Sequence, residues 1–420
     1  MAPPEPKLST TVLVVGAGST GLALAQGLKK VVITPTSAGI PTIVVEKHDS
    51  LDAHNRDWNM GLHWGAGPLQ ALLPEEQWSR IQSVQVDPNE PTAEQDALNF
   101  LNGQSGEAMA SIPARLFYRL RRRKLRGLME PGLDIRYGQK LQDIQCSADG
   151  EHATAMFEDG SSISASIIVG ADGARSTTRH VLLGPNRGEV RRLPYCATFI
   201  QAQYSAERAR YLRQFHPLYI AGINPAGYFS FFGLHDATDR ERPDTWTFFF
   251  YISWHSSLQE QRETAGWSNA QRLEQVKKFA KTYTDPWKSA FEWLPDDQQV
   301  WHMGLSDFDP REKSHRWDNR GGRVTLAGDA AHAMTYQRGQ GLNHSITDAA
   351  NLVEAVRRFV SGEATRADAI REYEDEMISR AGSEVGLSTV NTAMLHDWHK
   401  VLQSPVMTSG MKRSTEIIAN

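Results

Sequence analysis

An apolar, β-branched run that leads directly into closely spaced glycines constrains this chain more than any other feature. The segment reads TTVLVVGAGSTGLALAQGLKK, with Gly16, Gly18 and Gly21 in the pattern GxGxxG. The run before Gly16 suits a buried parallel strand, and apolar residues from Leu22 onward recur at helical spacing. The sequence therefore predicts a strand, a tight turn and a helix, which together begin a nucleotide-binding α/β unit.

The three glycines have separate tasks in such a turn. Gly16 permits the tight turn, Gly18 lets backbone N–H groups approach a pyrophosphate, and Gly21 allows the helix to pack closely on the strand. A second buried strand, in PTIVVEKHDS, ends at Glu46, whose carboxylate can accept hydrogen bonds from a ribose, and Lys47 follows it. An ordinary glycine-rich turn does not explain that acid, so we predict an adenine dinucleotide site that includes both residues.

Glu46 lies further from the glycines than is usual for such a unit. The extra residues, VVITPTS at positions 31–37, follow the predicted helix. They are at its C-terminal side, away from the phosphate end. We therefore expect a surface loop there with little effect on binding.

Two further segments place an acid and glycines directly after a buried strand. In IIVGADGARSTTR the strand is followed by Asp172 and Gly173, although Asp-Gly is also a common turn pair. In VTLAGDAAHAMTYQRGQGLN, Gly328 precedes Asp329, which can bind a ribityl or ribose hydroxyl. Residues Gly339, Gly341 and Leu342 open the next helix, whose N–H groups can face the pyrimidine edge of a flavin.

The middle of the chain is rich in aromatic residues. YCATFIQAQY, GYFSFFG and TWTFFFYISW, within residues 195–254, predict strands of an antiparallel sheet. IPARLFYRLRRRKLRGLME, earlier in the chain, reads as a basic helix. We divide the chain into residues 1–184, a first part of a dinucleotide-binding domain, residues 185–315, a substrate domain that is mainly antiparallel sheet, and residues 316–420, which return to the first domain and add C-terminal helices.

Charge and composition narrow the class of protein. The chain has 420 residues with 45 Lys and Arg against 49 Asp and Glu, which gives no reason to expect a nucleic-acid partner. The basic run RLRRRKLR, residues 119–126, is typical of a solvated helix face. Two cysteines indicate no disulfide framework, and no stretch suits a signal peptide or a membrane span. We therefore expect a soluble cytoplasmic protein without a metal site, and the sequence carries no signal for its oligomeric state.

Together and in this order, the three glycine-containing segments resemble the signature set of class A FAD-dependent monooxygenases, the para-hydroxybenzoate hydroxylase type. In that family GxGxxG holds the ADP half of FAD, a DG motif is associated with FAD and NAD(P)H, and a GD motif contacts the ribitol or ribose. The DG motif is matched by Asp172, Gly173, Ser176 and Arg179, and the GD motif by Gly328 and Asp329. The resemblance implies an α/β fold with a Rossmann-like, GR2-type FAD-binding domain and an inserted antiparallel substrate sheet.

The resemblance also implies roles for single residues. The family usually has an arginine before a Leu-rich helix that contacts FAD, matched by Arg122, and another near the flavin, for which Arg56 is the candidate. We therefore expect one arginine of the basic run to be functional and the others to be solvated. Where the family commonly has a proline beside the flavin, this chain has Tyr336. Its hydroxyl and ring put the detailed active-site geometry of the family in doubt.

Four residues are candidates for substrate or proton handling. An arginine just before the first aromatic strand can stabilise a developing oxyanion, and a surface arginine pair is the alternative. Titratable side chains near the GD motif are further candidates. The four are Arg191, Arg192, His332 and Tyr336.

The resemblance implies that NADPH or NADH reduces FAD, that O₂ adds at the flavin C4a, and that the hydroperoxide transfers oxygen to the substrate. The substrate would be a hydrophobic, electron-rich small molecule such as an aromatic, an indole or an alkene, hydroxylated or epoxidised. A weaker resemblance is to fungal natural-product monooxygenases of secondary metabolism. The alternatives are an oxidase, reductase or halogenase of the same fold, although a Trp-x-Trp-x-Ile motif is missing for a halogenase, and a non-catalytic FAD-binding scaffold.

Overall fold

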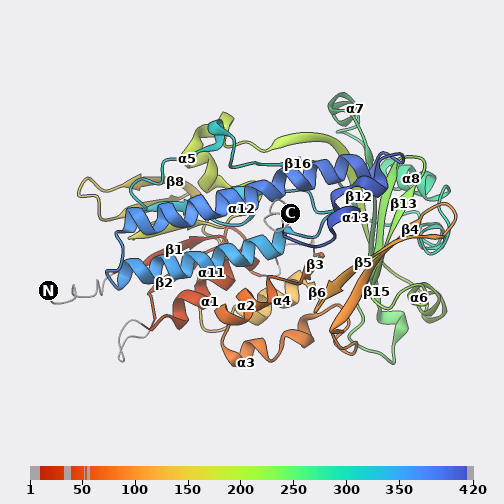
Figure 1. Ribbon diagram of the computed structural model, residues 1–420, viewed down its shortest axis with the longest axis horizontal. Coiled ribbons are helices and arrows are strands. Elements are labelled where there is room, and N and C mark those ends of the chain that lie inside the picture. Colours follow the sequence, from red (N-terminus) through yellow and green to blue (C-terminus); the bar gives the residue numbers. More distant parts are fainter. Residues whose placement is uncertain (1–9, 33–38, 52, 54–56, 414–420) are drawn as a thin grey trace.

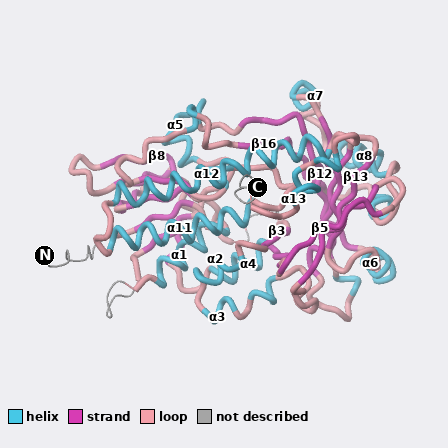
Figure 2. The backbone as a smooth tube through the Cα atoms, viewed as in Figure 1, coloured by secondary structure: helices cyan, strands magenta, loops and turns pink. Residues whose placement is uncertain are grey.

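Two sheets of different construction lie side by side in the computed structural model, which describes residues 10–32, 39–51, 53 and 57–413 (Figure 1). A parallel sheet with long helices along it occupies one half, and a larger sheet occupies the other (Figure 2). Arg56 and most of the extra loop expected at residues 31–37 fall outside the described residues.

The smaller of the two is a five-stranded parallel sheet in the order β17-β11-β1-β2-β7. Its strands are β1 (Val12–Val15), β2 (Thr42–Val45), β7 (Asp134–Arg136), β11 (Ile167–Gly170) and β17 (Val324–Leu326). The central strand is buried on both faces, as its unbroken apolar sequence predicts. The sheet therefore draws its strands from both ends of the chain, as expected for a domain with a long insertion.

Different layers cover the two faces of the parallel sheet. Apolar side chains of five helices form the core on one face: α1 (Ser19–Lys30), α2 (Ala66–Leu72), α4 (Arg122–Met129), α11 (Gly341–Val360) and α12 (Arg366–Leu395). The other face packs against a three-stranded antiparallel sheet and one helix: β8 (Leu141–Cys146), β9 (Ala153–Phe157), β10 (Ser162–Ala165) and α5 (Thr177–Arg187). This is the predicted Rossmann-like half.

The larger sheet has seven strands in the order β16-β12-β15-β14-β13-β4-β5. They are β4 (Gln95–Asn102), β5 (Ala108–Arg115), β12 (Arg191–Gln203), β13 (Tyr219–Asn224), β14 (Tyr228–Asp236), β15 (Thr247–His255) and β16 (Val300–Asp307). The aromatic segments predicted as strands are β12 to β15. Two strands come from before residue 185, and β4 pairs with β13 in parallel, so the sheet is mixed rather than purely antiparallel.

The basic helix expected over residues 112–130 begins only at Arg122. The residues before it extend instead, as the end of β5 and as β6 (Tyr118–Arg121), which pairs with β3 (Asn59–Leu62). The prediction was wrong there because strand pairing with distant segments overrides local helical preference.

Each face of the larger sheet has its own apolar core, since side chains alternate along a strand. Phe250 points to one core, which the helices α6 (Ala206–Arg213), α8 (Asn269–Ala280) and α9 (Trp287–Glu292) complete. Tyr251 points to the other, which also contains Tyr336 and Phe117 from the parallel-sheet half. We call this second surface the aromatic face, and it is where the two halves meet.

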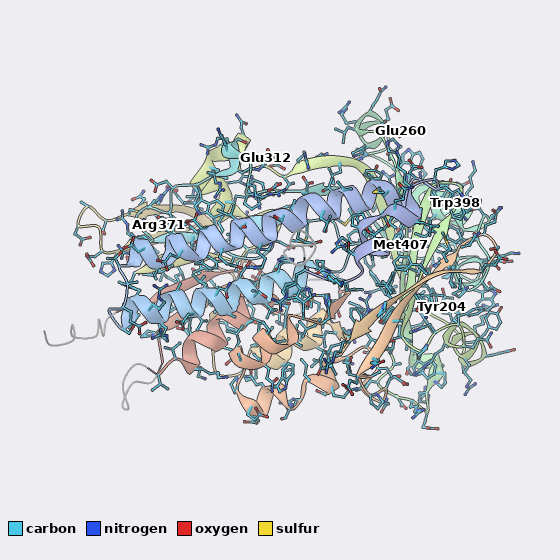
Figure 3. The ribbon with its side chains drawn as sticks, in the orientation of Figure 1. Tyr204, Glu260, Glu312, Arg371, Trp398 and Met407 are labelled. Atoms are coloured by element: carbon cyan, nitrogen blue, oxygen red, sulfur yellow. The ribbon has the colours of Figure 1, made fainter. Side chains whose placement is uncertain are left out.

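Helix α12 connects the two halves lengthwise. In Figure 3, Arg371 near its beginning and Trp398 just beyond its end lie at opposite ends of the molecule. Trp398 and Met407 pack on the aromatic face. The remaining elements are short: α3 (Glu75–Trp78), α7 (Leu258–Glu263), α10 (Asp329–His332), α13 (Pro405–Ser409), η1 (Ile81–Val84), η2 (Pro243–Thr245), η3 (Lys313–His315) and η4 (Val401–Gln403). Within the described ranges, no helix combines the length and apolarity that a membrane crossing requires.

Candidate functional site

The three glycine-containing segments converge at one edge of the parallel sheet. They follow the adjacent strands β1, β11 and β17, whose carboxyl ends meet there. A Cβ atom on Gly16 would lie 2.6 Å from the carbonyl oxygen of Ala171, and one on Gly328 would lie 2.6 Å from Oγ1 of Thr20. The glycines therefore allow the three segments to pack directly on one another, at the edge where open α/β sheets bind ligands.

The beginning of α1 has the features of a pyrophosphate site. Gly18 is the N-cap, no side chain caps the helix, and its first turn contains no acidic residue. The Ser19 hydroxyl is buried without a hydrogen-bond partner among the described residues. Free N–H groups, the positive end of the helix and an orphaned hydroxyl fit the phosphates of FAD.

Glu46 is buried at the end of β2, beside the glycine turn. Its carboxylate accepts hydrogen bonds from the N–H groups of Ala17, at 3.0 Å, and His48, at 3.1 Å. A carboxylate has about four acceptor positions, so Glu46 can hold the turn and still bind a ribose. Lys47 points to solvent.

Asp172 and Gly173 shape the start of α5. The Asp172 carboxylate accepts from the Ser176 hydroxyl at 2.5 Å and from the Thr178 N–H at 3.0 Å, while Gly173 has a φ of +80°. Arg179, fully buried, donates to the carbonyl oxygens of Ala174, at 2.6 Å, and Ala330, at 2.9 Å. The DG segment is thereby fixed to the GD segment.

A buried ionic cluster supports the GD turn. The Asp348 carboxylate accepts from the Gly328 N–H at 2.8 Å and from Arg380 at 2.7 Å, and it lies 2.5 Å from Nε2 of His332. Burial favours the neutral acid, but His332 and Arg380 outweigh it and hold the pKa of Asp348 well below its usual value. His332 is fully buried and engaged in this cluster, which gives it a supporting position behind the turn.

Asp329 differs from its neighbours in facing open space. Its side chain is exposed, yet desolvation by the surrounding protein raises its pKa, against the opposing charges of His332 and Arg179. The carboxyl group is thus accessible at a position that the surrounding protein partly desolvates. That setting fits the binding of a ribityl or ribose hydroxyl.

Helix α11 begins directly after the loop that follows the GD turn. Gly339 has a φ of +65°, Gly341 and Leu342 begin the helix, and no side chain caps it. Asn343, in the same turn, accepts from the N–H groups of His63, at 2.9 Å, and Gly65, at 3.0 Å. Asn343 was not predicted from the sequence, because an asparagine in a first helical turn carries no signal for a partner that is 280 residues away.

Arg119 and Arg126 of the basic run are buried and Arg121 is paired with two aspartates, so the prediction that all but one of its arginines are solvated is wrong. Arg122 lies with its guanidinium carbon 4.5 Å from the centre of the Trp58 ring. Burial lowers its pKa to about 10, opposed by Asp57, Glu46 and Asp329 among others. Arg126 is 4% exposed and donates from Nε to the carbonyl oxygen of Ala17 at 2.8 Å. Both therefore lie close to the glycine turn.

The structure separates the four candidates for substrate handling. The Tyr336 ring lies 5.2 Å from Tyr251 and 5.6 Å from Phe199, and its hydroxyl is buried without a hydrogen-bond partner among the described residues. Arg191 is bound to Asp307 through contacts of 2.9 and 2.7 Å, and Arg192 is exposed. Tyr336 alone of the four is placed on the aromatic face, whereas the arginine pair lies at the strand end where β12 meets β16.

Comparison with known proteins agrees with this geometry. A family model described as an FAD binding domain matches residues 9–385. The FAD-dependent monooxygenase cctM of Talaromyces islandicus is 35% identical over 403 residues, which cover 96% of this chain and 97% of that protein. The FAD-dependent monooxygenase phnB of Penicillium herquei is 34% identical over 404 residues, which cover 96% and 95%.

Two solved structures have the same fold. Klebsiella pneumoniae HpxO, complexed with FAD and uric acid, superimposes with a TM-score of 0.71 at 20% identity, covering 98% of this chain and 95% of that one. The 2,6-dihydroxypyridine-3-hydroxylase of Arthrobacter nicotinovorans superimposes with a TM-score of 0.72 at 16% identity, covering 94% of each chain.

Proposed function

The chain belongs to the FAD binding domain family and is an FAD-dependent monooxygenase, and we propose that it takes electrons from NADPH or NADH to hydroxylate or epoxidise a hydrophobic, electron-rich small molecule. An aromatic, an indole or an alkene fits this description. The observation that carries the proposal is the contact of Tyr336, from the loop after the GD motif, with Phe199 and Tyr251 of the larger sheet. The loop after the GD motif, which we call the cofactor loop, thus packs against the aromatic face.

FAD, when bound, supplies the redox chemistry: it accepts electrons from the nicotinamide and activates O₂. The residues of the chain hold it in place. The uncapped start of α1 suits the pyrophosphate, Glu46 suits the ribose of the ADP half, and Asp329 suits a hydroxyl between pyrophosphate and flavin. The uncapped start of α11 suits the pyrimidine edge of the ring.

The aromatic face suits the oxygen-transfer step. Rings bind a flat apolar molecule through a large contact area and keep water away from the reacting atoms. Water exclusion matters because activated oxygen that meets no substrate leaves as hydrogen peroxide. An oxidase, which releases hydrogen peroxide as its product, has less need to keep water away from the reacting atoms, and this favours a monooxygenase of organic substrates.

Single-turnover spectroscopy tests the proposal. The FAD-loaded protein is mixed anaerobically with NADPH or NADH, with and without indole, a phenol or an alkene, and the bleaching of the flavin is followed. Mixing with ¹⁸O₂ then gives the mass of the product. We expect at least one compound to accelerate bleaching and to gain one ¹⁸O atom.

Two outcomes would contradict the proposal. A yellow protein that neither nucleotide reduces, whatever compound is present, would favour a scaffold. Reduction followed by hydrogen peroxide as the only product with every compound would favour an oxidase or a reductase.

A further inference from the structure

Arg119 is a buried arginine on the aromatic face. It lies on β6, 8% exposed, with its guanidinium carbon 4.7 Å from the centre of the Phe231 ring and 5.9 Å from that of Tyr219. Its backbone is fixed on both sides, because its N–H donates to Gln85 at 3.0 Å and its carbonyl oxygen accepts from Val86 at 2.9 Å. The backbone of Arg119 is therefore fixed, and its guanidinium packs against the two rings.

No group among the described residues balances this charge. Arg119 forms no ion pair there, and its buried Nε donates to no acceptor. Arg121, two residues along the same strand, shows the usual arrangement, since Asp57 lies 2.7 Å from its Nε and Asp236 also binds it. Tyr219, whose ring lies near Arg119, donates from its hydroxyl to Asp96 at 3.0 Å.

A buried cation of this kind is costly unless something compensates it. Contact with the Phe231 ring offsets part of the cost, but a ring face accepts no directed hydrogen bond from Nε. An anionic oxygen supplied by a ligand would satisfy both the charge and the free donor, because the guanidinium fork matches such oxygens.

A row of aromatic rings runs from Arg119 to the cofactor loop. The Phe231 ring stacks on Tyr251, with centres 5.8 Å apart and an angle of 13° between the planes. Tyr251 in turn contacts Tyr336 at 5.2 Å. A continuous row of rings therefore joins the arginine to the loop after the GD motif, and a flat molecule lying along that row would reach both.

We propose that Arg119 is the substrate-recognition residue for an anionic oxygen, a carboxylate or an ionised hydroxyl, on a planar conjugated substrate bound along the aromatic face. This rests on the proposed function, because it takes the aromatic face to be the substrate site. It narrows the substrate class from any hydrophobic electron-rich molecule to one that carries an acidic oxygen at one end.

Equilibrium dialysis on the FAD-loaded enzyme, without nicotinamide, tests the proposal. Two probe pairs differ mainly in charge: 2-naphthoate against 2-naphthamide, and 2,4-dihydroxybenzaldehyde at mildly alkaline pH against its dimethyl ether. The proteins are wild type, Arg119→Gln, Arg119→Lys and the control Arg115→Gln, which alters an exposed arginine on the neighbouring strand β5. Flavin absorbance and thermal unfolding confirm that each variant is folded and loaded.

We expect the wild type and Arg115→Gln to bind at least one anion about tenfold or more tightly than its neutral partner. Arg119→Gln should bring that ratio close to one without changing the affinity for the neutral probe, and Arg119→Lys should keep part of it. A preference in the naphthoate pair would indicate recognition of a carboxylate, and one in the dihydroxybenzaldehyde pair recognition of an ionised hydroxyl. A wild type without preference in either pair, or an Arg119→Gln that retains the preference, overturns the proposal.

Stability gives a second, independent test. If the charge of Arg119 is uncompensated until a ligand binds, the Arg119→Met protein should unfold at the same temperature as the ligand-free wild type or at a higher one. A large loss of stability would instead make Arg119 a structural residue and overturn the proposal. Neither test uses turnover, so a preference for anions without any oxygenated product would contradict the proposed function alone.

Discussion

Arg179 donates a hydrogen bond to the carbonyl oxygen of Ala330, 2.9 Å away, and so joins the segment after β11 to the segment after β17. The same guanidinium also donates to the carbonyl oxygens of Ala174, Gly188 and Asp329. Because Arg179 is fully buried, these four oxygens have few other sources of a donor. The side chain therefore joins the DG segment to the GD segment.

Removing the hydrogen bonds of Arg179 should affect stability and FAD retention together. We expect Arg179→Met to lower the free energy of unfolding by at least about 3 kcal/mol, because several buried carbonyl oxygens lose their donor. Urea denaturation and the flavin-to-protein absorbance ratio measure the two effects. Arg175→Met, a change at an exposed arginine of the same segment, should alter neither. An Arg179→Met protein as stable as wild type would show that these hydrogen bonds are not needed for stability.

Gly328 should tolerate no side chain. Its φ is +64°, and a Cβ atom would lie 2.6 Å from Oγ1 of Thr20 and 3.0 Å from Oγ of Ser345. We expect Gly328→Ala to cost on the order of 2–4 kcal/mol and to weaken FAD binding, through backbone strain and the clash combined.

A glycine with free space around it supplies the control for that change. Gly127 lies in α4, and a Cβ atom there would meet only Cδ2 of Leu51, at an ordinary contact distance of 3.8 Å. Gly127→Ala should therefore gain about 0.5–1 kcal/mol, because alanine favours a helix over glycine. Calorimetry and flavin titration of both variants check the contrast. Equal stability of the two would contradict the structural account of Gly328.

Local sequence was sufficient to predict the parallel-sheet half. Buried strands ending in glycine or in glycine and acid are signals within one short segment, and the carboxyl ends of adjacent parallel strands must meet. The convergence of Gly16, Asp172 and Gly328 at one edge follows from that geometry. Their roles toward FAD stay predictions, as do those of Lys47 and Arg56.

Pairing between distant segments was beyond the sequence analysis. β4 and β5 join the larger sheet only because β4 pairs with β13, more than 100 positions later. The burial of Arg119 and Arg126 has the same origin, since a run of arginines carries no trace of the rings and carbonyl groups that surround it in the fold. Asp348 is a further case, because its partners come from the GD turn and from α12.

Glu374 should make stability depend on pH near neutrality. Burial raises its pKa from 4.5 to about 7, against hydrogen bonds from Thr325, Trp317 and Asn319. Between these two values the native protein holds a proton that the unfolded chain releases, so the free energy of unfolding falls as the pH rises from 4.5 to about 7. The loss attributable to Glu374 is on the order of 3 kcal/mol and is complete above pH 7.

Urea denaturation from pH 5 to pH 8 measures that fall. Glu374→Gln should flatten it, whatever its effect on absolute stability, because the side chain no longer titrates. Glu207→Gln, a change at an exposed acid of α6 that is remote from Glu374, should leave the wild-type slope in place. A slope that persists in Glu374→Gln would assign the pH dependence to another group.

The Tyr336 hydroxyl should matter for the reaction and not for folding. It is buried near the Ser253 hydroxyl but forms no hydrogen bond of good geometry among the described residues, so Tyr336→Phe should change stability by no more than about 1 kcal/mol. If the hydroxyl contacts the substrate, the variant should yield less oxygenated product and more hydrogen peroxide per nicotinamide consumed. Product chromatography and a peroxidase-coupled assay measure this partition.

Tyr283 offers a matched control on the opposite face of the larger sheet. Its hydroxyl is likewise buried near a serine, Ser230, without a hydrogen bond of good geometry in the described structure, but its ring belongs to the other apolar core. Tyr283→Phe should share the effect on stability and leave the partition of products unchanged. An unchanged partition in Tyr336→Phe as well would remove Tyr336 from the catalytic candidates.

The arrangement of the parallel sheet also sets the order of events during synthesis. β17, at Val324–Leu326, completes the sheet by pairing with β11, and the GD turn follows directly. A nascent chain shorter than this has the glycine turn and the DG segment but lacks their neighbour. Helix α12, which supplies Arg380 to the cluster behind the GD turn, is translated later still. The GD turn and the cluster behind it are therefore complete only after about nine tenths of the protein has been made, and we expect cofactor loading to belong to the last stage of folding.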